Sequence, residues 1–396
     1  MGNEIPTLPG VLLDDTQDAK LLLELRHTVQ QLTGTINQDF PGSQPVSFTR
    51  HESIPALLEN DYYVCEKSDG VRVLILIGTV SPSGATSAAA EPTPDAVYFI
   101  TRKNMYHQVS TAPSQPDTWT LVDAELVVDV EDDGQRVQRL LAFDALVVDS
   151  ICCMTHPLPK RLGKLEQNVV RKLNAKREKY LRQSPELCMP FELQMKHFEL
   201  SYGAVRVMNE VVPHLKHASD GLIFTSVNAP YVAGTCSEVI KWKPANENSV
   251  DMLAHVVDQG AGRPPMVQLY VWEGGNRYVF YGFLALTQKE WDEVIWPARG
   301  DRDSINGCVL EVLYDPDYCP PAEWRFMRVR SDKTNANHLT VVSRVRTSID
   351  DGLSFKELET TMTEIRINWK RRAEAINEAR AQKQSADSAP AENNTI

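Results

Sequence analysis

The residues best suited to covalent chemistry lie in the stretch EKSDGVR at positions 66–72, which has the spacing KxDGxR. Apolar residues flank it on both sides, and this predicts two strands joined by a turn. Lys67 is expected at the end of a buried strand, where a desolvated amine beside other cations becomes a nucleophile. We expect Asp69 to act as an acceptor, Gly70 to let a phosphate approach the backbone, and Arg72 to bind it. An exposed surface turn explains these few residues equally well, because short motifs match by chance.

Two carboxylates are predicted to share one face of a central strand. The run VDAELVVDV at 122–130 alternates and then becomes continuously apolar, as a buried strand does. Asp123 and Glu125 are two residues apart, so their side chains point to the same side. Such a pair is costly unless a cation or a sugar hydroxyl meets it. The alternative is an ordinary solvated pair.

Four further candidates lie in or beside predicted strands and turns. They are Arg102 at the end of VYFITR, Phe143 in the apolar strand 140–149, Lys196 in the predicted strand 191–198, and Asp220 in an Asp-Gly turn. Each also has a plain structural explanation, since strand-end cations, core phenylalanines and Asp-Gly turns are common.

The string VIKWKP at 239–244 carries two lysines on one predicted strand face. Lys241 and Lys243 would point to one side and Trp242 to the other. Neighbouring ammonium groups repel, so they favour an anion such as phosphate between them. An edge strand protected by lysines is the alternative.

From about residue 247 the pattern changes to short alternating strands, among them 266–272, 278–284, 309–314 and 324–329. Glycine and proline punctuate them, which predicts a small five-stranded barrel of the OB type. In its most charged segment, Arg328 and Arg330 share a strand face, and Asp332 and Lys333 follow in a loop.

The chain is predicted to form two domains. Residues 1–245 form the first and 246–353 the barrel, while 384–396 are expected to be a disordered tail and 81–95 a flexible loop. Helices are predicted at 15–33, 158–182 and 354–383. The last of these has a capping box and an apolar stripe, so we expect it to pack back on the first domain.

The composition excludes several classes of function. The net charge of −12 argues against a protein that coats nucleic acid, although a local basic cleft remains possible. The seven cysteines have no metal-finger spacing, which favours reduced thiols in the cytosol or nucleus. No apolar run is long enough for a membrane helix, and the amino terminus has no signal-peptide pattern.

The order of these motifs resembles that of fungal-type mRNA capping enzyme guanylyltransferases, which belong to the covalent nucleotidyltransferases. KxDGxR, KWKP and RxRxDK carry the resemblance, which covers about residues 38–372. One segment departs from the family pattern, because Ala124 replaces the usual glycine before Glu125. The implied fold is α+β, with a mainly antiparallel nucleotidyltransferase domain, a C-terminal OB barrel and a terminal helix that returns to the first domain.

The resemblance implies a role for each candidate. Lys67 would be the nucleophile, and Glu125 and Asp220 would also be ligands of a divalent metal, Mg²⁺ or Mn²⁺. Arg102 would contact the ribose, Phe143 would stack on the purine, and Lys196 would lie near guanine O6. Nucleotide binding would involve Arg72, Arg102, Glu125, Phe143, Lys196, Asp220, Lys241, Lys243, Arg328, Arg330, Asp332 and Lys333, with Gln44 as a weaker candidate. Arg72, Lys241 and Lys243, together with the metal, are expected to crowd the Lys67 amine and favour its deprotonation.

The implied reaction uses GTP to form a lysyl-GMP adduct and transfers GMP to the 5′-diphosphate end of nascent mRNA. The resemblance also implies a separate RNA 5′-triphosphatase subunit, docking to the phosphorylated C-terminal repeats of RNA polymerase II, and a nuclear location. Docking candidates are Lys160, Arg161, Lys164 and Arg171. The barrel is expected to close over the β- and γ-phosphates about a hinge near residues 245–250.

Three alternatives remain at this stage. An ATP-dependent DNA or RNA ligase would share the lysine chemistry but use adenine. An inactive scaffold would keep the nucleotidyltransferase fold without activity. An RNA-binding OB protein with a large appendage is the third, and the acidic net charge speaks against it.

Overall fold

The computed structural model describes residues 6–80, 94–112, 114–185, 188–244, 248–257, 266–292 and 305–387. Its internal contacts divide the chain into two compact units. The first contains Met1–Ser47, Ser53–Trp242 and Glu359–Ile396, and the second contains Phe48–Glu52 and Lys243–Leu358. The main border therefore falls at residue 243, close to the predicted border at residue 246.

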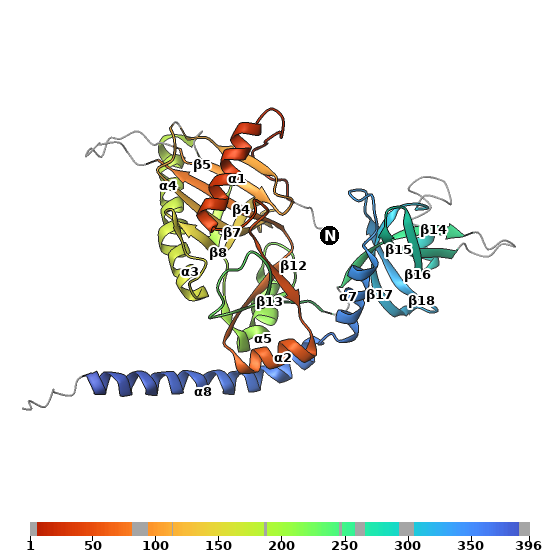
Figure 1. The fold of residues 1–396 in the computed structure, drawn as a ribbon. Helices are drawn as coiled ribbons and strands as arrows, with labels where there is room; N and C mark the ends of the chain where they lie inside the picture. The colour runs from red at the N-terminus through yellow and green to blue at the C-terminus, as the bar shows by residue number, and fades with distance from the viewer. Residues whose placement is uncertain are drawn as a thin grey trace, which may run out of the picture. The chain divides into compact units, whose positions relative to one another are not determined.

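The first unit contains a large, mostly antiparallel sheet (Figure 1). Its strand order is β1-β6-β5-β4-β7-β8-β10, and β9 pairs with β8. The strands are β1 (Val11–Leu12), β4 (Val71–Thr79), β5 (Ala96–Thr101), β6 (Tyr106–Ser110), β7 (Thr118–Val130), β8 (Arg136–Val148), β9 (Ile151–Cys152) and β10 (Glu192–Met195). The strand β10 runs parallel to β8.

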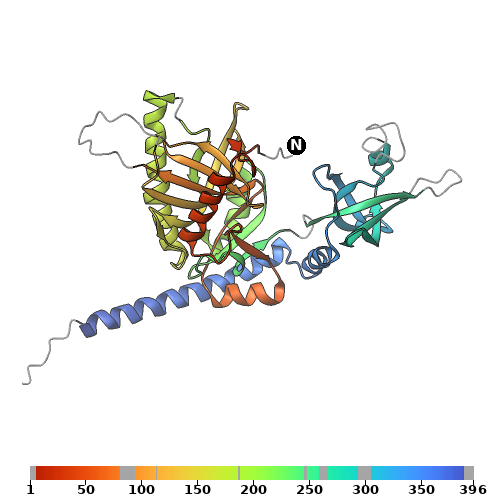
Figure 2. The ribbon, with the colours of Figure 1, turned by 45° about the horizontal axis from the view of Figure 1, so that its top comes forward.

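Helices cover both faces of this sheet, which explains the continuous apolar sequence of its central strands. Helix α1 (Ala19–Thr33) lies across one face, while α3 (Leu158–Lys164) and α4 (Arg171–Gln183) lie on the other (Figures 1 and 2). On β4, Leu74 packs in the core that includes Leu25 of α1, and Ile75 packs in the core on the side of α3 and α4. A strand buried on both faces needs no polar alternation.

A second sheet completes the first unit. Its order is β11-β3-β12-β13-β2, formed by β2 (Ser43–Ser47), β3 (Tyr62–Ser68), β11 (Glu199–Leu200), β12 (Ser219–Ser226) and β13 (Gly234–Trp242). The strands β3 and β4 are consecutive in the chain but belong to different sheets. The chain passes between the sheets again from β10 to β11. A candidate residue lies at each crossing: Lys67 is the second-last residue of β3, and Lys196 lies in the connection from β10 to β11.

The other helices of this unit pack around the second sheet. They include α5 (Ala204–Arg206), most of α2 (Arg50–Glu59) and the part of α8 (Phe355–Asp387) that begins at Glu359. The Trp369 ring of α8 lies 5.8 Å from the Tyr202 ring, and Arg372 Nε donates to Asp61 Oδ1 at 2.8 Å. The predicted return of the terminal helix to the first domain is thus confirmed.

The second unit is a closed five-stranded barrel, as predicted. Its strand order is β14-β15-β16-β18-β17. The elements are β14 (Ser249–Val257), β15 (Met266–Gly274), β16 (Arg277–Ala285), α6 (Gln288–Glu290), β17 (Val309–Cys319), β18 (Ala322–Val329) and α7 (Leu339–Asp350). Trp324, Leu269 and Leu310 are fully buried in its core. Among the described helices of the whole chain, none is long and apolar enough to cross a membrane.

Several elements differ from the sequence predictions. The predicted strand 191–198 is broken, and Lys196 lies in the connection between β10 and β11. Helix α1 starts at Ala19 and not at residue 15, because Asp14 accepts hydrogen bonds from the backbone N–H groups of Thr16 and Gln17. The helices α2 and α7 were not predicted, and α2 carries Pro55 inside it.

Three predictions lie partly or wholly outside the described residues. Most of the flexible loop predicted at 81–95 falls there, as do residues 245–247 of the hinge and residues 388–396 of the tail. Helix α8 continues to Asp387, four residues beyond its predicted end.

Close packing requires a glycine at position 70, and the predicted approach of a phosphate to this backbone stays a prediction. A Cβ atom added there would lie 2.3 Å from the carbonyl oxygen of Leu126 on β7. We expect Gly70→Ala to lower the free energy of unfolding by about 1–3 kcal/mol, as overpacked substitutions do. Gly163→Ala is the matched control, because a Cβ there meets nothing within 4 Å and should stabilise helix α3 by up to about 1 kcal/mol. Denaturant unfolding of both variants measures the difference, and equal stabilities would contradict this packing argument.

Candidate functional site

Lys67 lies next to the point where the chain leaves the second sheet for the first. Its Nζ atom is 2.6 Å from Oδ1 of Asp220 on β12, the strand that pairs with β3. Both side chains are partly exposed, with 23% and 21% of their surface accessible. The amine is therefore reachable by a ligand, and the charged group at hydrogen-bond distance from it is a carboxylate.

Arg72 is held by the protein itself, in contrast to the predicted open fork for a phosphate. Its Nε and Nη2 atoms donate to the carboxylate of Asp123 at 2.9 and 2.6 Å, and Nη1 donates to the Ser43 carbonyl at 2.6 Å. Asp123 is fully buried and also accepts from the Tyr231 hydroxyl at 2.5 Å. Burial and Asp123 raise the pKa of Tyr231 well above its ordinary value, so the phenol keeps its proton. Arg72 thus ties β4 to β7 and to β2.

Two cations lie close to the ring of Phe143. Its ring centroid is 5.6 Å from the Arg72 guanidinium carbon and 5.9 Å from Lys196 Nζ. Cations this close to an aromatic ring are attracted by its negative face. The side chain is only partly buried. Stacking of this ring on a base stays a prediction.

Glu125 shares its surroundings with the three cations of the site. Burial raises its pKa, while Lys196, Lys67 and Arg72 act in the opposite direction, and the net shift is upward. On the sheet, Glu125 is the cross-strand partner of Arg72. The two carboxylates predicted to share a strand face, Asp123 and Glu125, therefore have cations of the protein itself as partners.

Lys196 is buried and bound to two residues that flank the Lys67 position. Its Nζ atom donates to Ser68 Oγ at 3.0 Å and lies 3.4 Å from Glu66 Oε1. Burial alone would lower the pKa of Lys196, but Cys65, Glu66 and Glu125 outweigh it and raise the value. An ammonium group has three N–H donors, so these two partners leave one for a ligand.

Three further candidates are Arg102 and Lys241 of the first unit and Lys243, with which the second unit begins its main segment. Arg102 follows β5 and donates to Oε1 of Gln44 at 2.9 Å, which brings together two candidates far apart in sequence. Lys241 is on β13, with β12 between it and β3. Lys243 lies beyond the end of β13, so the predicted strand face holds only the first of the two lysines.

In the second unit, the RxRxDK residues form one charged cluster. Arg330 pairs with Asp332 through two hydrogen bonds of 2.8 Å and with Asp251 at 3.0 Å. Lys333 also pairs with Asp251, and Arg328 donates to Glu311 at 2.6 Å. Asp332 has a depressed pKa, mainly because of the Arg330 hydrogen bonds. The predicted strand face holds only Arg328, because β18 ends at Val329, but both arginines lie close to one partner, Glu311.

Arg161 is not a surface residue, which corrects its prediction as a docking candidate. Only 1% of its side chain is exposed, and Nε and Nη2 donate to the Asp144 carboxylate at 2.7 and 2.8 Å. Its Nη1 atom donates to the carbonyl of Ala229 at 2.7 Å. Arg161 is a buried structural residue that joins α3 to β8.

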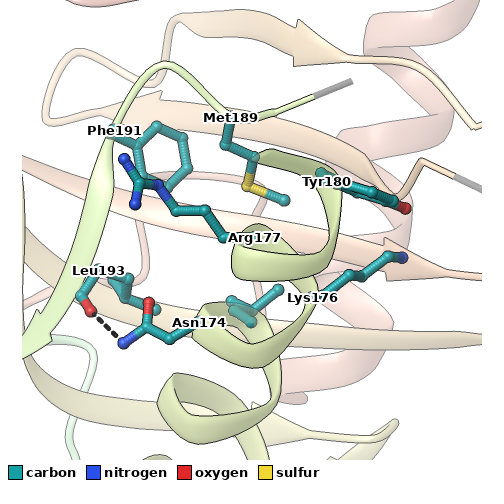
Figure 3. Close-up of a pocket in the computed structure, with 8 residues that line it drawn as sticks. Asn174, Lys176, Arg177, Tyr180, Met189, Phe191 and Leu193 are labelled. Atoms are coloured by element: carbon teal, nitrogen blue, oxygen red, sulfur yellow. Dashed lines mark hydrogen bonds between the residues drawn. The ribbon is translucent and has the colours of Figure 1, made fainter. Parts of the chain in front are cut away.

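Two pockets lie near these elements in the described part of the chain. One is an open polar pocket of about 380 Å³ that reaches Glu66, Lys196 and His217. The other lies between α4 and β10, where Asn174 donates to the Leu193 carbonyl at 3.0 Å (Figure 3). The latter pocket has about 20 Å³ of space and is far too small for a nucleotide.

Sequence reasoning missed four residues that hold the site together: Ser68, Asp129, His217 and Tyr231. The one available signal was the alternation of β3, because Glu66 and Ser68 point away from Lys67 and must meet something else. Ser68 lies 149 positions from His217, and Tyr231 lies 108 positions from Asp123. No local pattern predicts contacts of that separation.

The described residues of the first unit offer carboxylate oxygens to a metal ion, but they do not form a complete set of ligands. Among the described residues, no cluster of three or more His, Cys, Asp or Glu side chains could hold an ion. Glu125 and Asp220, which both lie beside Lys67, supply the kind of oxygen ligand that Mg²⁺ takes. Because Mg²⁺ is usually bound by one or two carboxylates together with substrate phosphates, these residues fit such a site.

Family models match nearly the whole chain. The catalytic domain of mRNA capping enzymes matches residues 5–245, and their C-terminal domain matches residues 247–359. Among solved structures, a mycobacterial DNA ligase D complexed with ATP and MES is 16% identical, with a TM-score of 0.35 over 74% of this chain and 95% of that one. That similarity is weak.

Curated relatives agree with the family models. The mRNA-capping enzyme subunit alpha of Schizosaccharomyces pombe is 34% identical over 403 residues, which cover 97% of this chain and 94% of that protein. The protein of the same name from Saccharomyces cerevisiae is 30% identical, with coverage of 93% and 87%. The mRNA-capping enzyme of Caenorhabditis elegans is 28% identical, over 85% of this chain and 50% of that one. The chain therefore belongs to the mRNA capping enzyme family.

Proposed function

We propose that this protein is an mRNA guanylyltransferase that forms a covalent lysyl-GMP intermediate and transfers GMP to the 5′ end of RNA. The observation that carries this proposal is the position of Lys67. Its amine is accessible at the junction of two sheets, next to Asp220 and close to Glu125. The capping-enzyme family match over both units agrees with this chemistry.

In the first half-reaction, Lys67 Nζ attacks the α-phosphorus of GTP. A phosphorus–nitrogen bond forms, the bond to the β-phosphate oxygen breaks, and pyrophosphate leaves. The amine must lose a proton to do this, and the Asp220 carboxylate at 2.6 Å is placed to accept it. Of the cations predicted to crowd the amine, Arg72 is already paired with Asp123, and the contribution of Lys241, Lys243 and the metal stays a prediction.

In the second half-reaction, the terminal phosphate oxygen of a 5′-diphosphate RNA attacks the same phosphorus. The phosphorus–nitrogen bond breaks, and Lys67 regains its proton as GMP passes to the RNA. Phe143 offers a flat ring for the purine, and Lys196 has a free N–H donor beside that ring. Arg102 and Gln44 are proposed contacts of the nucleotide at the edge of the site.

A divalent metal, Mg²⁺ or Mn²⁺, is proposed to bind with GTP through Glu125 and Asp220. When bound, it neutralises charge on the phosphates. Lys241 and Lys243 are proposed to contact the phosphates as well, because Lys241 lies on β13, two strands from Lys67, and Lys243 follows the end of that strand.

The direct test incubates the protein with α-labelled GTP or ATP and separates the products on a denaturing gel. We expect a labelled band with GTP and much less with ATP. Labelling with ATP alone would identify a ligase-type enzyme, and no labelling with either nucleotide would identify an inactive scaffold.

The charged cluster of the second unit is proposed to act in the first half-reaction only, on the β- and γ-phosphates that leave as pyrophosphate. Asp332→Ala removes the partner that fixes two of the Arg330 donors. We expect adduct formation to fall by about tenfold or more and GMP transfer from preformed adduct by less than about threefold. Asp317→Ala, an exposed carboxylate of the same barrel, is the control. Equal losses in both half-reactions would refute the assignment.

The biological setting is also proposed. Relatives named as alpha subunits point to a partner subunit, and we propose that this partner is an RNA 5′-triphosphatase that prepares the 5′-diphosphate end. Docking to the phosphorylated C-terminal repeats of RNA polymerase II and a nuclear location follow from the same role. Lys160, Lys164 and Arg171 remain docking candidates after Arg161 is removed.

A further inference from the structure

We infer that His217, held by Asp129, is a positioning residue that orients Ser68 and Lys196 and so contributes to the choice of guanine over adenine. This inference rests on the proposed function and assigns a role to two residues outside the catalytic motif. His217 Nδ1 lies 2.7 Å from Asp129 Oδ1, and Nε2 lies 3.3 Å from Ser68 Oγ. Only 8% of the His217 side chain and 10% of the Asp129 side chain are exposed.

The hydrogen-bond direction in this chain follows from Asp129. Its other oxygen pairs with Arg139 at 2.5 Å, and these hydrogen bonds hold the pKa of Asp129 below its usual value despite burial. Asp129 is therefore a carboxylate and can only accept, so Nδ1 of His217 carries a hydrogen. In the neutral imidazole, Nε2 then has a lone pair for the hydroxyl hydrogen of Ser68.

The direction of the Ser68 hydroxyl affects how firmly Lys196 is held. Ser68 has one hydrogen and two acceptors within reach, His217 Nε2 at 3.3 Å and Glu66 Oε1 at 3.2 Å. When His217 takes that hydrogen, Glu66 remains for Lys196 and Ser68 Oγ offers its lone pair to the ammonium. Two of the three Lys196 N–H donors are then held by these partners. The tetrahedral geometry of the ammonium group sets the direction of the third.

A fixed ammonium donor beside Phe143 distinguishes the two purines. Guanine presents the O6 carbonyl as an acceptor, where adenine presents an amino group that is itself a donor. Lys196 can only donate, so it favours guanine and disfavours adenine. The chain Asp129–His217–Ser68–Lys196 also joins β7 of the first sheet to β3 of the second. Asp129, Lys196 and His217 line the open polar pocket.

Two substitutions separate positioning from structural support. The side-chain amide of His217→Asn reaches only as far as Nδ1, so it keeps the Asp129 contact and loses the Ser68 contact. The longer amide of His217→Gln reaches as far as Nε2, so it keeps an acceptor for Ser68. The measurements are equilibrium binding of GTP and ATP, KM and kcat for adduct formation, and the midpoint of unfolding.

We expect His217→Asn to weaken GTP binding and raise KM roughly tenfold, and to change kcat by less than about threefold. The ratio of the affinities for GTP and ATP should fall. His217→Gln should stay within about threefold of the unmodified protein in GTP affinity, KM, kcat and the GTP-to-ATP affinity ratio. Unchanged selectivity in His217→Asn, or impairment in His217→Gln alone, would overturn the inference. An unmodified protein that binds GTP selectively without forming an adduct would refute the proposed function but not this positioning role.

Discussion

Lys67→Arg is expected to abolish the lysyl-GMP adduct while leaving the fold intact. The guanidinium keeps a positive charge opposite Asp220, which now lies 2.6 Å from the lysine amine. It cannot act as the nucleophile, however, because it stays protonated under all working conditions. Adduct formation should fall by at least about 1,000-fold, since the covalent step has no other route.

The controls for this substitution separate chemistry from stability. The Lys67 side chain is partly exposed, so the free energy of unfolding should change by less than about 1 kcal/mol. Lys172→Arg, at an exposed lysine paired with Asp149, should leave labelling unchanged. Labelling of Lys67→Arg at the level of the unmodified protein would show that another residue carries the nucleotide.

Arg161→Leu is expected to cause the largest loss of stability. It removes both hydrogen bonds to Asp144 and leaves a buried carboxylate without its cation. Breaking a buried ion pair in this way typically costs about 3–5 kcal/mol. Lys160→Leu, one residue earlier and exposed, should change the free energy of unfolding by less than about 0.5 kcal/mol.

A double substitution tests the cause of that loss. Removing Asp144 as well leaves no uncompensated charge, so Arg161→Leu with Asp144→Leu should recover a large part of the stability. Denaturant unfolding of the two single variants and the double variant provides the cycle. A double variant that is less stable than Arg161→Leu alone would contradict the account of an unpaired buried carboxylate.

The sequence predicted the strands and helices around the site, because their patterns are local. The apolar runs on both sides of residues 66–72 correctly placed Lys67 at a strand end. The alternating strands after residue 247 correctly predicted the barrel. The terminal helix was recognised by its cap, where Ser354 and Glu357 exchange hydrogen bonds.

The pairing of these strands could not be predicted from local sequence patterns. Two strands and a short turn look alike whether they form a hairpin or pass from one sheet to another, so the transfer between β3 and β4 left no local signal. The pairing of Arg72 with a carboxylate of the protein was not predicted, for a related reason. Its partner Asp123 lies on β7, and the pairing of β4 with β7 is a property of the whole sheet.

The residues that support the site from distant parts of the chain could not be predicted from the sequence either. His217 looks like an ordinary residue before a turn, and Arg161 looks like one more cation in a basic helix. Only the packed structure shows that the first meets Ser68 and the second meets Asp144. Burial, which depends on the complete fold, separates these residues from the solvated charges beside them.

The most direct test of the central claim is peptide mass spectrometry of the full chain after incubation with Mg²⁺ and GTP. The account predicts one added GMP, held by an acid-labile phosphorus–nitrogen bond, on the peptide that contains Lys67. Treatment with pyrophosphate should remove it by reversing the first half-reaction. Absence of the added mass, or its presence on any other residue, would contradict the account.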